Sequence, residues 1–255
     1  MTLQLVTGPT NASKAGVVLG LVREWAVAGR RPVLVVPTGP DAIRYRRELV
    51  RVGGGVSYDV TVGTYGTLTE LVRGTLALPR PRLSPVQLDR VLAAALAAVD
   101  RGRPLGDTAT KRGVRRRLAA LLEELAERGF GPDDLCRDLA TLDAAEHGID
   151  RRLIEDLRTV LGHAARAGER IRDREGRPLP TPAAQGLMVR RALAADPAAW
   201  GARPVAWYGF DDLTFPQQAM VRTLARAADV VVSLPYEDGR VATAARRPVV
   251  DALRA

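Results

Sequence analysis

Residues 3–20 read LQLVTGPTNASKAGVVLG, and this stretch decides how the fold of the chain is interpreted. Residues 3–7 form a short apolar run that ends at Gly8, which is typical of a strand followed by a turn. Residues 14–28 are compatible with a helix, and Gly29 supplies its stop signal. The sequence therefore predicts a strand, a loop and a helix in direct succession.

The same alternation of strand and helix continues on both sides of a long middle segment. Residues 32–36 (PVLVV) are almost continuously apolar, as expected for a strand that is covered on both faces. The predicted strands are residues 3–7, 32–36, 60–63, 204–208 and 229–234. Helical patterns follow most of them, and this alternation is typical of α/β proteins with a parallel, doubly wound sheet.

The middle of the chain carries helical patterns alone. Residues 84–87 (SPVQ) are a well-formed helix start, with a serine cap, a proline in the first turn and a glutamine three residues after the serine. Apolar residues at helical spacing follow there and again near residues 114–128. We therefore expect an α/β domain made of residues 1–79 and 200–255, interrupted by an all-helical insertion subdomain at residues 80–199.

The loop at residues 8–15 (GPTNASKA) has the spacing of a phosphate-binding loop. In the motif G-x-x-x-x-G-K-[ST], backbone N–H groups and a helix N-terminus hold phosphate between a strand and a helix. Gly8 and Lys14 stand at the motif positions, but Ser13 replaces the second glycine and Ala15 replaces the hydroxyl that binds magnesium. We expect a P-loop NTPase-like fold that has lost hydrolysis; a chance spacing and a divergent but active NTPase are the alternatives.

The second half of such a nucleotide site belongs at the end of a later strand, where Asp holds magnesium and a second carboxylate acts on water. Residues 208–218 read YGFDDLTFPQQ. In superfamily I helicases of the UvrD type, the corresponding strand ends in Asp-Glu and is followed by a threonine and a glutamine. The segment resembles this pattern when Thr214 and Gln218 are placed on those landmarks, which puts Gly209 and Phe210 at the carboxylate positions.

Two aspartates follow these positions, and they lie two residues late for the expected roles. They serve in a nucleotide site only if the alignment is shifted by two. The degenerate nucleotide site implied by the resemblance comprises Gly8, Ser13, Lys14, Ala15, Gly209, Phe210, Asp211, Asp212 and Gln218. We expect it to use no cofactor, while leaving room for weak ATP or phosphate binding at the helix N-terminus.

Several further segments are similar to AddB-type helicase–nuclease subunits, which also carry Gly-Phe after this strand. Residues 35–38 (VVPT), followed by residues 48–49 (EL), resemble the strand and helix after the phosphate loop. Residues 62–65 (VGTY) resemble the next motif, which contacts single-stranded DNA in true helicases, and residues 231–235 (VVSLP) resemble the following strand. The resemblance spans residues 3–236, interrupted by a helical stretch that these helicases also carry as a subdomain.

This resemblance implies a role in the recombinational repair of DNA double-strand breaks. The chain is expected to be a non-hydrolysing, helicase-like DNA-binding and scaffold module of a DNA-end-processing helicase–nuclease, with DNA and a helicase–nuclease partner subunit as its partners. AddB-type proteins end in a PD-(D/E)XK nuclease region that needs a Glu-x-Lys to hold metal, and this sequence contains no Glu-x-Lys. It therefore resembles an N-terminal piece that is not itself catalytic and that acts with a C-terminal nuclease region.

The expected DNA contacts lie at the carboxyl ends of strands and on the helix after the second strand. They are Thr38, Arg44, Arg47, Thr64 and Tyr65. For these arginines, for Arg46 and for residues 115–117 (RRR), a solvated helix face is the alternative interpretation. Two other classes of protein stay open: an active P-loop enzyme, such as a helicase motor or a small-molecule kinase, and a pure protein-interaction domain.

Composition is consistent with a nucleic-acid partner. Of 38 basic residues only Lys14 and Lys111 are lysines, so the net charge of +9 rests on arginine, a planar donor suited to phosphate. The pI near 10.6 is typical of basic nucleic-acid-binding domains. Cys136, the single cysteine, excludes an internal disulfide, and His147 and His163 lack metal-ligand spacing. We therefore expect no metal site. The sequence has no long apolar stretch and no signal-peptide pattern, so we expect no membrane contact and a cytoplasmic location.

Overall fold

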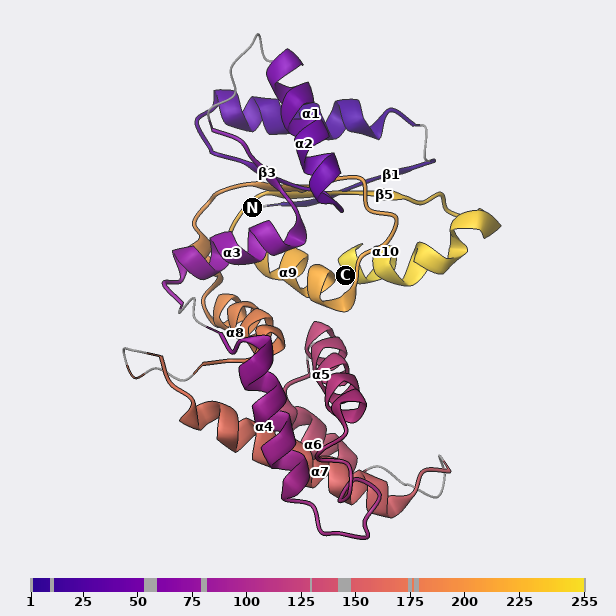
Figure 1. Cartoon of the computed structure of the whole chain (residues 1–255). Coiled ribbons are helices and arrows are strands. Elements are labelled where there is room, and N and C mark those ends of the chain that lie inside the picture. Colours follow the sequence, from indigo (N-terminus) through magenta and orange to yellow (C-terminus); the bar gives the residue numbers. More distant parts are fainter. Residues whose placement is uncertain are drawn as a thin grey trace. The chain divides into compact units, whose positions relative to one another are not determined.

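The computed structural model describes residues 2–9, 12–52, 59–78, 82–128, 130–141, 148–173, 176 and 179–254. The chain divides into two compact units (Figure 1). We call Met1–Leu78 together with Val189–Ala255 the α/β unit, and Pro79–Met188 the helical unit. The second boundary between the units lies between Met188 and Val189, inside a helix. The sequence pattern predicts this boundary later, after residue 199.

The α/β unit contains a sheet of five parallel strands, in the order β1-β5-β4-β2-β3. The strands are β1 (Leu3–Gly8), β2 (Val33–Val35), β3 (Thr61–Gly63), β4 (Val205–Trp207) and β5 (Val230–Pro235). All five lie where the apolar runs predict them. The prediction of an α/β fold with a parallel sheet is therefore confirmed.

Helices cover both faces of this sheet (Figure 1). On one face lie α1 (Lys14–Val27) and α2 (Gly39–Val52), and on the other lie α3 (Tyr65–Thr75), α9 (Phe215–Ala225) and α10 (Arg247–Arg254). Alternate strand residues point to opposite faces, so Leu34 and Val231 pack in the α1/α2 layer, while Val33 and Val232 pack in the other. The end of α8 (Pro182–Ala195) and the short 3-10 helices η1 (Pro197–Trp200) and η2 (Val241–Arg246) complete this unit.

The helical unit is built from α4 (Pro85–Ala97), α5 (Arg112–Glu127), α6 (Pro132–Thr141), α7 (Arg151–Arg170) and the start of α8. Ser84 caps α4 as predicted: its hydroxyl accepts from the Gln87 N–H at 3.3 Å, and Gln87 Oε1 accepts from the Ser84 N–H at 2.9 Å. Leucines of α4 and α5 pack against Val160 of α7 to form the core of this unit.

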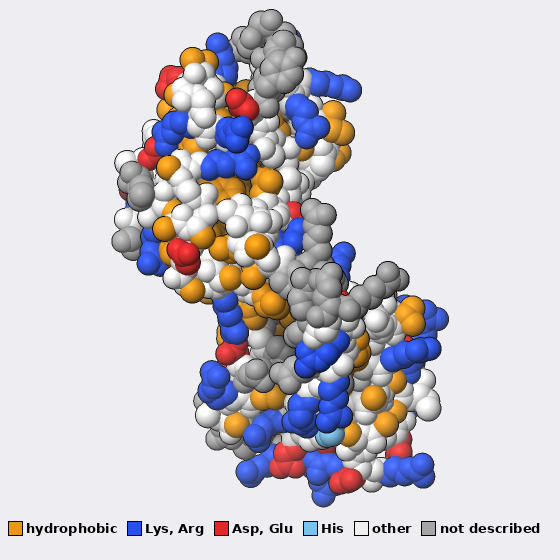
Figure 2. Space-filling model, turned by 90° about the vertical axis from the view of Figure 1, so that its left-hand side faces the viewer, with side chains coloured by type: hydrophobic (Ala, Val, Ile, Leu, Met, Phe, Trp, Pro, Cys, Tyr) orange, Lys and Arg blue, Asp and Glu red, His pale blue; other side chains and the backbone are white. Residues whose placement is uncertain are grey.

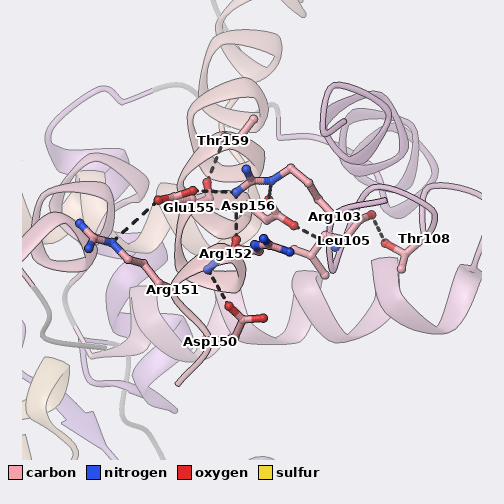
Figure 3. A network of polar contacts seen from close by, with 9 residues as sticks. All are labelled: Arg103, Leu105, Thr108, Asp150, Arg151, Arg152, Glu155, Asp156 and Thr159. Carbon is pink, nitrogen blue, oxygen red and sulfur yellow. Dashed lines mark hydrogen bonds and ion pairs between the residues drawn. The ribbon is translucent and has the colours of Figure 1, made fainter. Parts of the chain in front are cut away.

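A buried carboxylate holds the connection between α4 and α5 onto α7 (Figure 3). Asp156 is only 1% exposed. Its Oδ1 accepts from Arg103 Nε, and its Oδ2 accepts from the Leu105 N–H at 2.9 Å. Arg103 also donates to Glu155 Oε2 at 2.8 Å, and the Thr108 hydroxyl donates to the Leu105 carbonyl at 2.7 Å. One buried side chain thus fixes the path of a whole connecting segment.

A second carboxylate, in the α/β unit, links three segments that are distant in the sequence. Asp229, just before β5, accepts from the Thr2 N–H at 3.0 Å and from Arg30 Nη2 at 2.7 Å. The bond from Arg30, and then the bond from Thr2, hold the pKa of the Asp229 carboxyl below its usual value. The ionised carboxylate therefore stabilises the folded state.

We expect Asp229→Asn to lower the free energy of unfolding by about 1 kcal/mol at neutral pH, a small value because solvent screens this partly exposed pair. A carboxyl pKa that is lower in the folded than in the unfolded chain stabilises fully above the unfolded pKa, near 4, and loses that effect as the pH falls through the folded pKa. Urea unfolding between about pH 7 and pH 2.5 should thus show the difference between variant and wild type shrinking on acidification. A difference that is constant with pH would contradict this role.

Candidate functional site

The loops that follow the five strands leave the sheet along a single edge, which we call the carboxyl edge. The register sets Gly8 beside Pro235, Val232 beside Trp207, and Val35 beside both Trp207 and Gly63. The chain goes to the α1/α2 face after β1 and β2, and to the other face after β3, β4 and β5. Open α/β sheets bind ligands where neighbouring connections diverge. Such crevices are expected between β1 and β5 and on both sides of β2.

The described residues of the loop between β1 and α1 include two with unusual backbone conformations. Gly8 has φ +152°, which disfavours a side chain, and the Ala12 N–H donates to the Pro9 carbonyl at 3.1 Å. Ser13 takes a left-handed conformation, with φ 51° and ψ 22°, which is the reason that glycine is common at such a position. Thr10 and Asn11 lie outside the described residues.

The Lys14 side chain folds back onto the start of this loop. The residue is only 8% exposed, and its ammonium donates to the Gly8 carbonyl at 2.9 Å and to the Pro9 carbonyl. Burial lowers the pKa of Lys14, while the Glu237 carboxylate, which follows β5, acts in the opposite direction. An ammonium has three N–H donors, so one remains beyond these two carbonyl contacts. Glu237 was not singled out in the sequence; only the position of β5 beside β1 brings it near Lys14.

The first turn of α1 favours anions but offers no ligand for a metal. It contains no acidic residue, and the helix dipole is positive at this end. Ala15, at the position of the magnesium-binding hydroxyl, has no polar side-chain atom. The described start of α1 thus has a helix N-terminus without acidic side chains and an alanine as its second residue.

The end of β4 places no carboxylate at the two aligned positions. Gly209 has φ +83° and lies against Pro37; a Cβ at this position would lie 3.5 Å from Pro37 Cδ. Phe210 is buried, and its ring centroid lies 5.5 Å from that of Trp207, in the core beneath α9. The residue at the expected catalytic position is thus part of the hydrophobic core.

The two aspartates that follow have other surroundings. The Asp211 side chain is 88% exposed, with Oδ1 4.0 Å from Arg246 Nη2, and Arg246 Nε donates to the Asp211 carbonyl at 2.6 Å. Asp212 Oδ1 accepts from the Leu213 N–H at 2.8 Å.

The two halves of the candidate nucleotide site follow strands that are not neighbours. Because β5 separates β1 from β4, the ends of these two strands are roughly 10 Å apart at a spacing of about 4.8 Å per strand.

The polar residues at the start of α9 have local structural contacts. Gln218 Nε2 donates to the Leu213 carbonyl at 2.7 Å. Thr214 caps the helix, and its N–H donates to Gln217 Oε1 at 2.8 Å. The threonine and glutamine landmarks of the helicase pattern thus have helix-capping and loop-closing contacts here.

The structure brings three of the expected DNA contacts, Thr38, Thr64 and Tyr65, to the ends of the neighbouring strands β2 and β3. Thr38, after β2, accepts from the Asp41 N–H at 3.2 Å and so caps α2, while Thr64, after β3, caps α3 through a reciprocal bond with Thr67. The Tyr65 hydroxyl donates to the Pro216 carbonyl at 3.4 Å. These threonines thus have structural roles at the place where the resemblance locates DNA.

All four arginines of α2 are exposed, but Arg46 and Arg51 also have hydrogen-bond partners within the chain. Arg44 and Arg47 are exposed and, three residues apart, share one side of the helix. The Arg44 guanidinium lies 5.5 Å from the centre of the Tyr45 ring. Arg46 instead donates to the Val62 carbonyl at 3.0 Å, so it attaches α2 to β3. In the helical unit Arg115 is likewise structural, because it pairs with an aspartate of α4 at 2.8 Å.

An aromatic pair that the sequence did not predict fixes α2 beside β4. The rings of Tyr45 and Tyr208 meet edge to face, with centroids 5.2 Å apart. Burial, followed by the neighbouring Tyr208, raises the pKa of Tyr45 to about 12. Tyr45 therefore stays neutral, and its contact with Tyr208 holds α2 next to the end of β4.

The excess of positive charge is greater on the α/β unit. This unit has 18 basic and 12 acidic residues, a balance of +6, and the helical unit has 20 and 17, a balance of +3. On the face seen in Figure 2, basic side chains lie on both units and are interspersed with hydrophobic ones. Net charge alone therefore does not single out one surface, and the carboxyl edge is distinguished by its geometry.

A scan against protein-family models finds no match to the chain, and a search of curated proteins finds none. Within the described ranges, there is no group of three or more His, Cys, Asp or Glu side chains arranged to hold a metal ion. No described helix combines the length and apolar character needed to cross a bilayer.

Proposed function

We propose that this chain is a P-loop NTPase-like, helicase-like module that binds DNA without hydrolysing ATP and serves as a scaffold in a DNA-end-processing helicase–nuclease. The observation that carries the proposal is that two features occur in the same sheet. Lys14 stands in a loop with the spacing of a phosphate-binding loop, whereas Gly209 and a core-packed Phe210 follow β4. The anion-binding half of a nucleotide site is retained, whereas its metal-binding and water-activating half is replaced. The order of AddB-like segments along the chain supports the assignment to recombinational repair.

DNA binding is proposed at the carboxyl edge. Two helices, α3 and α9, begin there with no acidic residue in their first turns, both of which the structure describes. Their N-termini favour phosphate groups, and Arg44 and Arg47 add exposed guanidinium groups on the neighbouring α2. Contacts of this kind reach the DNA backbone rather than the bases. The expected binding is therefore independent of DNA sequence.

We expect a single-stranded oligonucleotide to bind with a Kd of roughly 10⁻⁴ to 10⁻⁶ M near physiological salt and much more tightly at low salt. The double variant Arg44→Ala/Arg47→Ala should reduce the slope of log K against log salt by about 0.7 for each phosphate that the protein no longer neutralises. Fluorescence anisotropy over a salt series measures both quantities.

The matched control is Arg23→Ala/Arg226→Ala, which removes two exposed arginines near the ends of α1 and α9, away from the carboxyl edge. This variant should keep the wild-type slope. If wild-type affinity does not change with salt, or if no binding is detected at low salt, the DNA-binding proposal is wrong and a protein-interaction domain becomes the better interpretation.

A further inference from the structure

An exposed aromatic side chain stands at the carboxyl edge, at the start of α9. Phe215 is 57% exposed, whereas Phe210, five residues earlier, is buried in the core. The first turn of α9 is already held by the capping box of Thr214 and Gln217. Phe215 lies outside the buried clusters of the described residues, so its ring is not explained by helix capping or by core packing.

The backbone beside Phe215 is tied to the start of α3. The Tyr65 hydroxyl donates to the carbonyl of Pro216, the residue after Phe215, so the first turns of α3 and α9 lie side by side. The Tyr65 ring packs against the ring of the buried Trp207, with centroids 6.0 Å apart. Phe215 is thus the neighbour in sequence of a residue that Tyr65 of the candidate DNA site contacts, and its side chain is exposed.

The charges around this ring are compatible with a nucleic-acid strand. The described first turns of α3 and α9 contain no acidic residue, so two helix N-termini favour phosphate here. The nearest carboxylates along the chain are Asp211, whose Oδ1 lies 4.0 Å from Arg246 Nη2, and Asp212, which accepts from the Leu213 N–H. An exposed aromatic ring near helix N-termini that favour anions fits the way in which single strands are bound, where bases stack on the ring and the backbone follows positive charge.

We propose that Phe215 is a stacking residue for a base of single-stranded nucleic acid. The inference rests on the proposed DNA-binding function and adds to it a residue and a strand type. A duplex keeps its bases stacked on one another, so only an unpaired base can cover the Phe215 ring. The site is therefore selective for single strands and tolerant of base identity.

The test compares two probes of equal length and charge: an oligothymidylate and an oligonucleotide in which every position is abasic. Phe215→Ala is expected to weaken binding of the oligothymidylate by about 5- to 100-fold and to change binding of the abasic strand by less than about twofold. Phe215→Tyr, which retains an aromatic ring, should bind oligothymidylate within about twofold of wild type. Phe130→Ala, which removes the exposed phenylalanine of the helical unit, is the matched control and should bind both probes like wild type.

The outcomes separate this inference from the function on which it rests. If wild type binds the oligothymidylate and Phe215→Ala binds it equally well, the stacking role is wrong, the DNA-binding proposal stands, and Phe215 becomes a candidate protein contact. If Phe215→Ala weakens both probes equally, the ring acts by some means other than stacking, which also overturns the inference. If wild type binds neither probe at low salt, both proposals fall.

Discussion

Steady-state ATP turnover by this chain is expected to stay at the uncatalysed background, with and without DNA, and Lys14→Ala is expected to leave DNA binding almost unchanged. In a working site, magnesium bridges the β- and γ-phosphates and is held by the loop hydroxyl and a strand-end Asp. In the alignment that we propose, Ala15 and Gly209 stand at these two positions and supply neither side chain. Phe210, which aligns with the water-activating carboxylate, is packed on Trp207 in the core.

The expected deficit is large because the missing groups act on one reaction step. Loss of a single group that stabilises the transition state typically costs on the order of 10² or more in rate, and losses within one site are not additive. Lys14 itself is engaged by the Gly8 and Pro9 carbonyls, so its removal is expected to affect the loop rather than the DNA contacts at β2, β3 and α9.

The measurement is ATP turnover by wild type, by Lys14→Ala and by Asp211→Ala/Asp212→Ala, each with single-stranded DNA present. All three should be indistinguishable from buffer. Turnover on the order of one per second that is lost in Lys14→Ala would show that the Lys14 loop belongs to an active ATP-hydrolysing site. Additional loss in the aspartate variant would place its metal-binding carboxylate two residues after the aligned position and would favour an active motor or kinase.

The second large effect is expected in the helical unit, where Asp156→Asn should lower the free energy of unfolding by roughly 2–3 kcal/mol. Both carboxylate oxygens accept from donors, Oδ1 from Arg103 and Oδ2 from the Leu105 N–H. An amide has one oxygen and one NH₂, so the NH₂ must face a donor, and the side chain is too buried for water to compensate. The connection between α4 and α5 then loses its attachment to α7.

The chain allows this effect to be assigned to one unit. All three tryptophans, Trp25, Trp200 and Trp207, lie in the α/β unit, so tryptophan fluorescence reports that unit, whereas far-UV circular dichroism reports both. In urea unfolding, Asp156→Asn should shift the dichroism transition of the helical unit. Asp138→Asn, at an exposed position of α6, is the matched control, with an expected effect within about 0.5 kcal/mol. Equal effects of the two variants would contradict the proposed role of Asp156.

Some features of the candidate site were predictable from local sequence. The strand, loop and helix around Gly8 and Lys14 follow from an apolar run, a glycine and a helical pattern, and the threonines at the ends of β2 and β3 follow from their places before helices. Other features needed the fold. Glu237 lies near Lys14 because β5 is inserted beside β1, and Pro216, the neighbour of Phe215, contacts Tyr65 because α9 and α3 cover the same face.

The sequence by itself determined the five parallel strands, the α/β class and the capped start of α4, because apolar runs, residue periodicity and capping side chains act over a few neighbouring residues. Only the tertiary structure decided the order of the strands and the boundary inside α8, whose residues Val189 and Leu193 join the core of the sheet. A helical pattern is the same whichever core it covers. Likewise, Arg46 and Asp156 look like surface charges in the sequence, and only long-range contacts make them structural.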